Sequence, residues 1–372
     1  MEIPERILLT TDTVGGVWTY AIELIRGLTR AGISVALATM GAPLNADQRR
    51  ETAGIRDLHL FESAFRLEWM ADPWDEIEQA GSWLLAIERQ FQPQLVHLNQ
   101  YCFGALPFRA PVVIAGHSCV ISWWQAVHGC EAPAEWSRYR DAVTRGLRAA
   151  ALVVAPSEAM LDSLAYYYGP LGRRMSIPNG RELPALPAVP KEPFLFAAGR
   201  FWDEAKNLGA LEQAAPELPW PIYVAGDVSH PDGAAGPCSH CRSLGRIDPR
   251  AMSEWMNRAA IYALPAKYEP FGLSILEAAL AGCALILGDI PSLRENWRDA
   301  AVFVAPEDRE GLLAAARAFI NSPELRIEFA QRARARAQNF SIARMTGGYL
   351  EAYRTVLELR APRALGHSFA GT

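Results

Sequence analysis

The chain begins with an alternation between short apolar runs and longer segments in which apolar residues recur at helical spacing. Residues 6–11 (RILLTT) form an apolar run that predicts a buried strand. After a turn at residues 12–16 (DTVGG), apolar positions recur every three or four residues as far as Leu28. Gly32 predicts the end of this helix, and residues 33–39 (ISVALAT) predict the next strand. The opening therefore predicts a βαβ unit with glycines at its first turn.

The same alternation continues through the first half and starts again after a proline-rich interval. Further strand-like runs occupy residues 95–98, 111–116 and 151–157. Residues 177–193 contain five prolines and show no apolar periodicity, which predicts a linker. More strand-like runs follow the linker, at residues 194–200, 221–227, 243–248, 261–266, 284–289 and 301–306. Strands that alternate with helices indicate parallel sheets covered on both faces, so the sequence predicts an α/β protein with two Rossmann-like domains.

The end of the chain predicts one more helix. Its apolar face is formed by Ile342, Met345, Tyr349, Tyr353 and Val356. Because this stripe needs a partner, we expect residues 350–359 to pack back on the first domain, which holds the N-terminus. The predicted division is residues 1–180 for the first domain, 181–340 for the second, and about 341–360 for the returning helix.

Composition and charge narrow the class of protein. A chain of 372 residues is too long for one ordinary core and suits two domains. The net charge of −5 gives no reason to expect nucleic acid as a partner. Six cysteines in a chain of this length do not indicate a disulfide scaffold, and the N-terminus lacks the pattern of a signal peptide. We therefore expect a cytoplasmic protein, a location compatible with peripheral contact at the inner face of a membrane.

One uncharged run could suggest a transmembrane helix. Residues 110–130 contain no charged side chain, and the run is nominally long enough to cross a bilayer. It includes His117, Ser122 and His128, which are unfavourable in hydrocarbon. A buried strand, a loop and the start of a helix explain the run better.

Two of the turns between a strand and a helix are suited to an anion. Gly15 and Gly16 let the backbone approach a ligand, with the dipole of a helix behind them. Arg200 and Lys206 lie in one loop after a strand, and two cations in a loop suit a diphosphate. An ordinary tight turn and a solvated surface loop explain these two patterns equally well.

A third turn, in residues 267–282 (KYEPFGLSILEAALAG), combines an anion site with carboxylates. Residues 271–273 lie at the predicted start of a helix, where backbone amides are unpaired. Glu269 precedes the helix, and Glu277 lies about five residues into it, roughly 7.5 Å along its axis. The two carboxylates can bracket a molecule with a diphosphate between two sets of hydroxyls, such as a nucleotide sugar. A surface glutamate plus an unrelated helix glutamate is the alternative.

Taken together, these motifs resemble those of the retaining glycosyltransferases of family 4, which have the GT-B fold. The resemblance covers nearly the whole chain. It is carried by GGVWTYAIELIRGLTRAG, GHS, APSEAM, IPNG, GRFWDEAKN, SLGRID and, most specifically, EPFGLSILEA. It implies two Rossmann-like domains with a cleft between them and a C-terminal helix that returns to the first domain.

The resemblance also implies which residues hold the diphosphate of a donor. Gly15 and Gly16 would contact the donor phosphate, and Arg200 and Lys206 would hold the diphosphate. Backbone amides at the start of the helix would complete this part of the site, at Phe271, Gly272 and Leu273.

The remaining residues implied by the resemblance contact sugars. Glu269 would bind hydroxyls of the transferred sugar, and Glu277 would bind the ribose of the nucleotide. His117, in the GHS motif, would contact the donor sugar near the reacting carbon.

Two departures from the family pattern leave the acceptor and the nucleotide base open. Arg181 and Glu182 follow IPNG, where the family more often has an apolar residue and an aspartate. Residues 229–243 are an insertion before LGRID, and within it residues 238–241 (CSHC) resemble half of a zinc site. A structural zinc ion needs four ligands, and no second pair follows, so incidental thiols explain this segment better.

The expected reaction is transfer of a hexose from a nucleotide-diphosphate sugar, such as a UDP- or GDP-hexose, to a hydroxyl acceptor. The acceptor could be a glycan, a lipid-linked sugar or a small molecule. We expect no metal and no further cofactor, because the fixed cations and helix amides can stabilise the diphosphate and the chain contains no Asp-x-Asp motif. Two alternatives remain, a nucleotide-sugar epimerase with the same fold and a non-catalytic nucleotide-sugar-binding protein.

Overall fold

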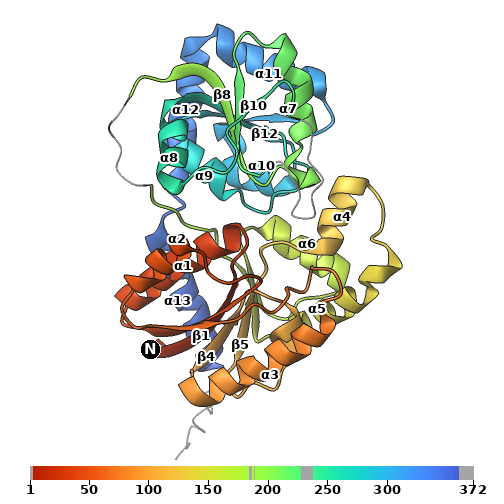
Figure 1. Cartoon of the computed structure of the whole chain (residues 1–372), viewed down its shortest axis with the longest axis vertical. Coiled ribbons are helices and arrows are strands. Elements are labelled where there is room, and N and C mark those ends of the chain that lie inside the picture. Colours follow the sequence, from red (N-terminus) through yellow and green to blue (C-terminus); the bar gives the residue numbers. More distant parts are fainter. Residues whose placement is uncertain (1–2, 184–186, 188, 228–237, 360–372) are drawn as a thin grey trace, which may run out of the picture.

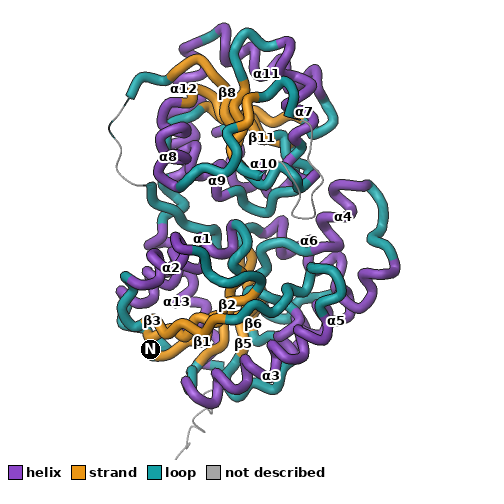
Figure 2. The backbone as a smooth tube through the Cα atoms, viewed as in Figure 1, coloured by secondary structure: helices purple, strands orange, loops and turns teal. Residues whose placement is uncertain are grey.

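The computed structural model describes residues 3–183, 187, 189–227 and 238–359 of the chain. These residues form two α/β domains, and the second lies above the first in Figure 1. In both domains helices lie on either side of the strands (Figure 2). The architecture confirms the expectation of two parallel-sheet domains.

The first domain is built on a parallel sheet. Among the described residues its strands are β1 (Arg6–Asp12), β2 (Ser34–Met40), β3 (Leu58–Glu62), β4 (Leu95–Leu98), β5 (Val112–Ala115), β6 (Leu152–Ala155) and β7 (Arg174–Ser176). Its helices are α1 (Gly16–Arg30), α2 (Ala46–Ala53), α3 (Trp74–Phe91), α4 (Val120–His128), α5 (Ser137–Ala149) and α6 (Glu158–Tyr168). The strand order is β3-β2-β1-β4-β5-β6-β7.

The second domain repeats this plan. Its described strands are β8 (Glu192–Ala198), β9 (Ile222–Ala225), β10 (Arg242–Ser243), β11 (Ala259–Leu264), β12 (Ala284–Gly288) and β13 (Val302–Val304), in the order β10-β9-β8-β11-β12-β13. Its helices are α7 (Leu208–Ala214), α8 (Pro249–Arg258), α9 (Leu273–Leu280), α10 (Pro291–Trp297), α11 (Arg309–Asn321) and α12 (Pro323–Ala337). Short 3-10 turns complete both domains, namely η1 (Cys102–Ala105), η2 (Ala134–Trp136), η3 (Glu204–Lys206), η4 (Ala215–Glu217) and η5 (Arg298–Ala300).

Alternation along the buried strands builds a core on each face of the first sheet. In β1, Leu8 packs with the residues of one face, and Ile7 and Leu9 pack with those of the other. Because both faces are covered, the central strands are apolar at nearly every position, which is why the sequence shows them as continuous apolar runs.

The last helix, α13 (Ile342–Glu358), leaves the second domain and packs against α1 of the first. Its residues Met345, Tyr349 and Tyr353 are buried in the same cluster as Ile7 and Leu9. The expected returning helix is therefore present in the fold.

The strand order determines where a ligand would lie. In both sheets the order reverses beside the first strand of the domain, between β1 and β4 and between β8 and β11. Open parallel sheets bind ligands at such reversal points, beyond the carboxyl ends of the strands. Gly15 follows β1, Arg200 follows β8 and Glu269 follows β11, so the predicted residues lie at these ends.

Some elements differ from the sequence-based expectations. Of the predicted strand at residues 243–248, only Ser243 is in a strand, because the exposed edge strand β10 is two residues long. The edge strands β3 and β7 are absent from the predictions, because both are partly exposed and lack a continuous apolar run.

The uncharged run at residues 110–130 forms β5, a loop and α4, as expected from its polar side chains. Across the described ranges, no helix is both long enough and apolar enough to cross a membrane.

Candidate active site

The two domains meet at the glycine turn after β1. Gly15 has a φ of +94°, which favours glycine, and a Cβ atom built on it would lie 3.1 Å from Nη1 of Arg200. A Cβ atom on Gly16 would lie 3.7 Å from Cδ1 of Leu273, the first residue of α9. The structure therefore brings together the glycine turn, the Arg200 loop and the start of α9.

Arg200 and Lys206 come from one loop but have different partners. The Arg200 side chain is 40% exposed and lies 3.9 Å from Asp203, so its guanidinium is only loosely paired. Trp123 Nε1 of α4 donates to Asp203 Oδ1 at 2.9 Å, which holds this loop against the first domain. Lys206 Nζ donates to Glu269 Oε2 at 2.6 Å. Lys206 therefore orients Glu269 directly, while Arg200 faces the glycine turn.

The loop that carries Glu269 is anchored to both domains. Tyr268 reaches into the first domain, where Cys119 N donates to its hydroxyl at 3.1 Å and Ser122 Oγ lies 2.8 Å from it. Ser157 Oγ of the first domain donates to Pro270 O at 3.2 Å, and Ser292 Oγ of the second donates to Glu269 O at 2.7 Å. These contacts fix the position of Glu269 at the domain boundary.

The start of α9 supplies backbone groups rather than side chains. Gly272 precedes the helix with a φ of +86°, and no side chain caps the first turn. The side chain of Phe271 is buried, and its ring centroid lies 5.4 Å from that of Phe340 in the core. Phe271 can therefore contribute only its backbone to a ligand, and the amides at this helix start remain a predicted contact for an anion.

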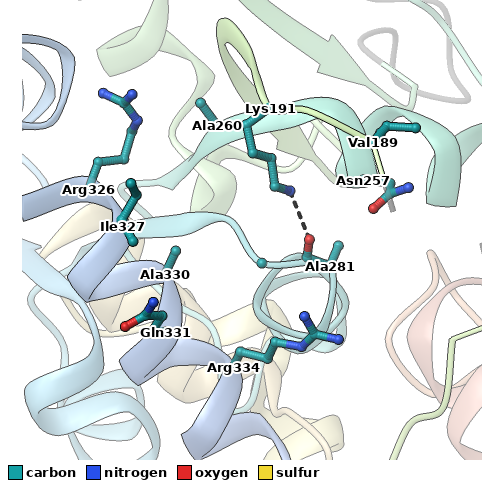
Figure 3. A pocket seen from close by; sticks show the side chains of 11 residues that line it. Val189, Lys191, Asn257, Ala260, Ala281, Arg326, Ile327, Ala330, Gln331 and Arg334 are labelled. Carbon is teal, nitrogen blue, oxygen red and sulfur yellow. Dashed lines mark hydrogen bonds between the residues drawn. The ribbon is translucent and has the colours of Figure 1, made fainter. Parts of the chain in front are cut away.

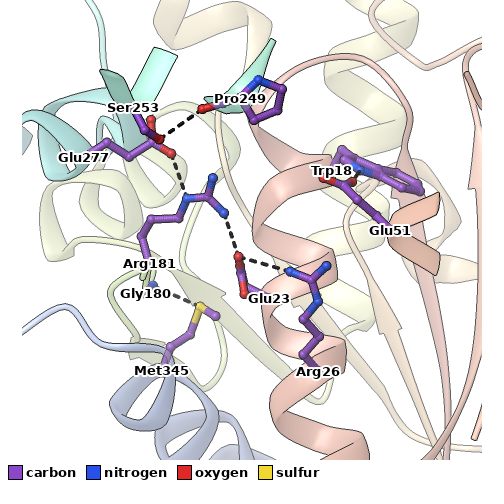
Figure 4. A network of polar contacts seen from close by, with 10 residues as sticks. All are labelled: Trp18, Glu23, Arg26, Glu51, Gly180, Arg181, Pro249, Ser253, Glu277 and Met345. Atoms are coloured by element: carbon purple, nitrogen blue, oxygen red, sulfur yellow. Dashed lines mark hydrogen bonds and ion pairs between the residues drawn. The ribbon is translucent and has the colours of Figure 1, made fainter. Parts of the chain in front are cut away.

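Glu277 has a partner that the sequence does not reveal. Arg181 Nε donates to Glu277 Oε1 at 2.7 Å, and Arg181 Nη1 donates to Glu23 Oε1 at 2.6 Å (Figure 4). Glu23 lies on α1, so this ion-pair chain spans the two domains. Only the departure of Arg181 from the family pattern could have pointed to it.

His117 lies after β5 and is held as a neutral ring. Burial lowers its pKa to about 4, so the imidazole is uncharged near neutral pH. Asn99 Nδ2 donates to Thr10 O at 2.6 Å, which directs Asn99 Oδ1 toward His117 Nε2 at 2.8 Å. The proton is therefore on Nε2, and Nδ1 is a hydrogen-bond acceptor. The ring of Tyr20 packs on His117 with centroids 4.3 Å apart.

Asp12 is a candidate site residue that sequence reasoning missed. It ends β1, immediately before the glycine turn, and its side chain is buried. Burial raises its pKa to about 7, against smaller opposing effects of the Val14 amide and the Arg200 charge. Val14 N donates to Asp12 Oδ1 at 3.1 Å. A carboxylate at the end of the first strand is the sequence signal that could have identified it.

Two family models match adjoining parts of the chain. Residues 14–183 match the model described as Glycosyltransferase Family 4, and residues 181–336 match the model described as Glycosyl transferases group 1. The chain belongs to glycosyltransferase family 4. The two matches overlap at residues 181–183, at the first chain crossing between the domains.

Sequence relatives of this family 4 chain include proteins with different names. A phosphatidyl-myo-inositol mannosyltransferase of Mycolicibacterium smegmatis is 28% identical over 201 residues, covering 49% of this chain and 52% of the relative. A glycogen synthase of Mycobacterium tuberculosis is 26% identical over 280 residues, covering 68% of this chain and 66% of the relative. The chain therefore spans about half of the first relative and just under two thirds of the second.

Solved structures share the fold over nearly the whole chain. Sucrose-phosphate synthase from Thermosynechococcus elongatus superposes with a TM-score of 0.78 at 18% identity, covering 95% of this chain and all of that one. Anabaena HepE, solved in complex with UDP and glucose, superposes with a TM-score of 0.71 at 15% identity, covering 94% of this chain and all of that one. At these identities the likeness shows the GT-B fold alone.

The CSHC segment of this family 4 protein is organised by a carboxylate. The carboxylate oxygens of Glu212 accept hydrogen bonds from the amides of Ser239, His240 and Cys241 at 2.8–2.9 Å. Residues 228–237, which include most of the predicted insertion, lie outside the described residues. Within the part of the chain that the structure describes, no three His, Cys, Asp or Glu side chains are grouped so that they could hold a metal ion.

A concave region of about 460 Å³ lies in the second domain beside α9 and α12 (Figure 3). Lys191 lines it and donates to Ala281 O at 2.8 Å, so this lysine caps the end of α9. None of the sequence-predicted site residues is among the described residues that line this region.

Proposed function

We propose that this protein transfers a hexose from a nucleotide-diphosphate sugar to a hydroxyl acceptor, with retention of anomeric configuration and without a metal ion. One observation carries the proposal. The glycine turn lies against both Arg200 and the start of α9, and two carboxylates, Glu269 and Glu277, lie before and within that same helix. This arrangement matches a diphosphate flanked by a hexose and a ribose.

The proposed chemistry at the diphosphate is electrostatic. As the bond to the sugar breaks, negative charge develops on the leaving diphosphate. The loosely paired guanidinium of Arg200, together with the free amides at the turn after β1 and at the start of α9, would stabilise that charge without reorganisation. Lys206 would add a second positive charge while it holds Glu269.

Three side chains would hold the donor sugar and the ribose. Glu269 would accept hydrogen bonds from hydroxyls of the hexose, because Lys206 and the anchored loop direct its carboxylate. The neutral ring of His117 would accept a hydroxyl hydrogen bond at Nδ1 near the reacting carbon. Glu277 would bind the ribose hydroxyls. We propose no covalent nucleophile.

The relatives support the transfer of a hexose and leave the acceptor open. The names of the sequence relatives describe a mannosyltransferase for phosphatidyl-myo-inositol and a glycogen synthase, and a structural neighbour was solved with UDP and glucose. We therefore propose a UDP- or GDP-hexose as donor and a glycan or lipid-linked hydroxyl as acceptor. The six cysteines are free thiols, which supports a reducing, cytoplasmic location.

A donor screen tests this proposal. UDP- and GDP-hexoses are incubated with the protein and mixed glycan or lipid acceptors in EDTA, and the released nucleoside diphosphate is measured. We expect release with one donor class, accelerated by acceptor and insensitive to EDTA. Isomerised donor without transfer would indicate an epimerase, and tight donor binding without any release would indicate a binding protein. Loss of activity on chelation, restored by magnesium or manganese, would contradict the metal-free mechanism.

A further inference from the structure

Arg181 occupies the point where the chain crosses between the domains. Its backbone amide donates to Phe340 O at 3.0 Å, next to the second crossing. A Cβ atom on Gly180 would lie 2.4 Å from Ser341 O, so only glycine allows the two crossings to touch here. Gly180 N also donates to Sδ of Met345 on α13 at 3.1 Å. The backbone of Arg181 is therefore held at a fixed place between the domains.

From this place the side chain of Arg181 reaches two carboxylates on different domains (Figure 4). Nε donates to Glu277 Oε1 at 2.7 Å, and Nη1 donates to Glu23 Oε1 at 2.6 Å. Arg26 Nη1 lies 3.5 Å from the same oxygen of Glu23. The side chains of Arg181, Glu277 and Glu23 are 20%, 15% and 7% exposed, so solvent screens these pairs only weakly.

The charges in this network balance, with two guanidinium groups facing two carboxylates. Burial opposes the charged form of Arg181, but the carboxylates of Glu277 and Glu23 outweigh it and raise the pKa of the guanidinium. Arg181 is therefore a permanent cation, and its planar guanidinium donates to one carboxylate from Nε and to another from Nη1. The hydrogen bond from Arg181 Nε to Oε1 restricts the rotation of the Glu277 carboxylate group.

We infer that Arg181 is a positioning residue for nucleotide binding, which holds the carboxylate of Glu277 in the orientation that receives the two ribose hydroxyls of the donor. This inference rests on the proposed function. Each carboxylate oxygen has two lone pairs, so Oε1 can accept from Arg181 and from a hydroxyl while Oε2 accepts from the second hydroxyl. Arg181 therefore assists the ribose rather than competing with it.

Glu23 connects Arg181 to the helix behind the glycine turn. This residue is on α1, the helix that begins at the glycine turn proposed to contact the phosphate. Through Glu23 and Arg181, the helix behind the phosphate contact and the carboxylate of the ribose contact are tied into one unit. Both ends of the nucleotide then meet groups whose spacing is preset.

The test is discrimination between ribose and its dideoxy analogue. Binding of UDP and of 2′,3′-dideoxy-UDP is measured by calorimetry, with the matching GDP pair in parallel. The wild-type protein should prefer the ribose form of the nucleotide that it binds. Arg181→Met should weaken ribonucleotide binding about tenfold, the size expected for a charge-assisted contact. Dideoxynucleotide binding should stay within about twofold, so the ratio collapses.

Three further variants sharpen the result. Arg344→Met is the matched control, because it removes an exposed arginine near the second crossing that bonds Asn339 and does not contact Glu277. Its ratio should equal that of the wild type. Arg181→Lys keeps the charge but loses the planar group that donates to both Glu277 and Glu23, so it should also lower the ratio. This variant replaces Arg181→Met as the test if Arg181→Met does not fold. Glu23→Gln should lower the ratio by a smaller factor.

The opposite outcomes overturn the inference. If folded Arg181 variants bind both nucleotides equally more weakly, Arg181 only ties the domains together. If they bind the ribonucleotide more tightly, Arg181 competes with the ribose. If the wild-type protein itself shows no preference for ribose, Glu277 does not bind ribose, and this part of the proposed function falls together with the inference.

Discussion

The carboxyl group of Asp12 has an environment unlike that of an ordinary surface aspartate. It is buried at the end of β1, beside the turn of Gly15 and Gly16, and burial raises its pKa from 3.8 to about 7. A pKa near neutrality in a cleft is common at functional sites, because such a group can exchange a proton at physiological pH. At the residue scale, the ionised carboxylate of Asp12 therefore lowers the stability of the folded protein, a cost that selection for stability alone would not retain.

Substitution of Asp12 should reveal this cost as a function of pH. The folded protein favours the protonated form of Asp12. The contribution of this residue to the free energy of unfolding is therefore present below about pH 4 and is lost as the pH rises from about 4 through about 7. Asp12→Asn keeps the acceptor for Val14 N and removes the charge. We expect the variant to be more stable by about 2–4 kcal/mol at pH 8 and by much less at pH 4.5. A gain in thermal midpoint that does not depend on pH would contradict the raised pKa.

Arg200 and Lys206 test the electrostatic part of the mechanism. Arg200→Ala and Lys206→Ala should each lower kcat/KM by about 10²–10³-fold, because a preorganised charged donor directed at the developing negative charge stabilises the transition state. Lys206→Ala should also lower kcat through Glu269, which loses its 2.6 Å partner. Arg332→Ala is the control for loss of a cation, because the exposed Arg332 side chain forms an ion pair only one helical turn away, with Glu328 on α12. Near-normal turnover in both site variants would remove these residues from the mechanism.

At the scale of elements, the loop between β11 and α9 owes its position to the opposite domain. Tyr268 is the clearest case, because its hydroxyl bonds Cys119 N and Ser122 Oγ of the first domain while Glu269 follows it in the chain. These hydrogen bonds anchor the residue that immediately precedes Glu269, whose carboxylate is proposed to bind the transferred sugar. Small displacements of a positioned group have large kinetic effects.

Removal of the Tyr268 hydroxyl should therefore affect turnover more than nucleotide binding. We expect Tyr268→Phe to lower kcat by about 3–10-fold and to leave the KM for the donor within about twofold. Steady-state kinetics with a varied donor concentration measure both values. Tyr166→Phe is the control, because this tyrosine is 81% exposed. A KM-only effect in Tyr268→Phe would mean that the loop positions the nucleotide instead.

The elements also show how far the sequence could be read. The strand at residues 95–98 and the helix after EPFG were predictable because buried runs and helix starts have local signatures. The edge strands β3 and β7 were not, since a partly exposed strand lacks such a run. The candidate site residues in the three strand-to-helix motifs could be proposed from the sequence. The ion-pair chain through Arg181 could not, because it joins segments that meet only in the folded protein.

At the scale of the whole molecule, α13 ties the end of the chain to the first domain. The apolar side of the helix packs beside α1. A buried polar contact is made by the hydroxyl of Tyr353, which lies 2.6 Å from Nδ1 of His97. Burial lowers the pKa of His97 to about 3, so the ring is neutral, and the hydroxyl of Tyr20 lies 3.3 Å from Nε2. Both nitrogens of a buried histidine are thus satisfied, one of them by the returning helix.

Loss of this contact should weaken the docking of the helix. Tyr353→Phe leaves a buried nitrogen of His97 without its partner, which should lower the free energy of unfolding by about 1–3 kcal/mol. Urea denaturation gives the midpoint and the slope, and the slope should not change. Donor KM should be unaffected in the folded variant. An unchanged midpoint would show that α13 is held by its apolar contacts alone.

The most direct test of the proposed nucleotide-sugar site compares Glu269→Ala with Glu277→Ala by donor kinetics, after thermal midpoints within a few degrees of the wild type confirm folding. Contacts to ribose persist from ground state to transition state, so Glu277→Ala should mainly raise the donor KM. Contacts to the transferred sugar tighten as its ring changes shape, so Glu269→Ala should mainly lower kcat. The same KM-only defect in both variants would contradict the role of Glu269, and no defect in either would contradict the nucleotide-sugar site itself.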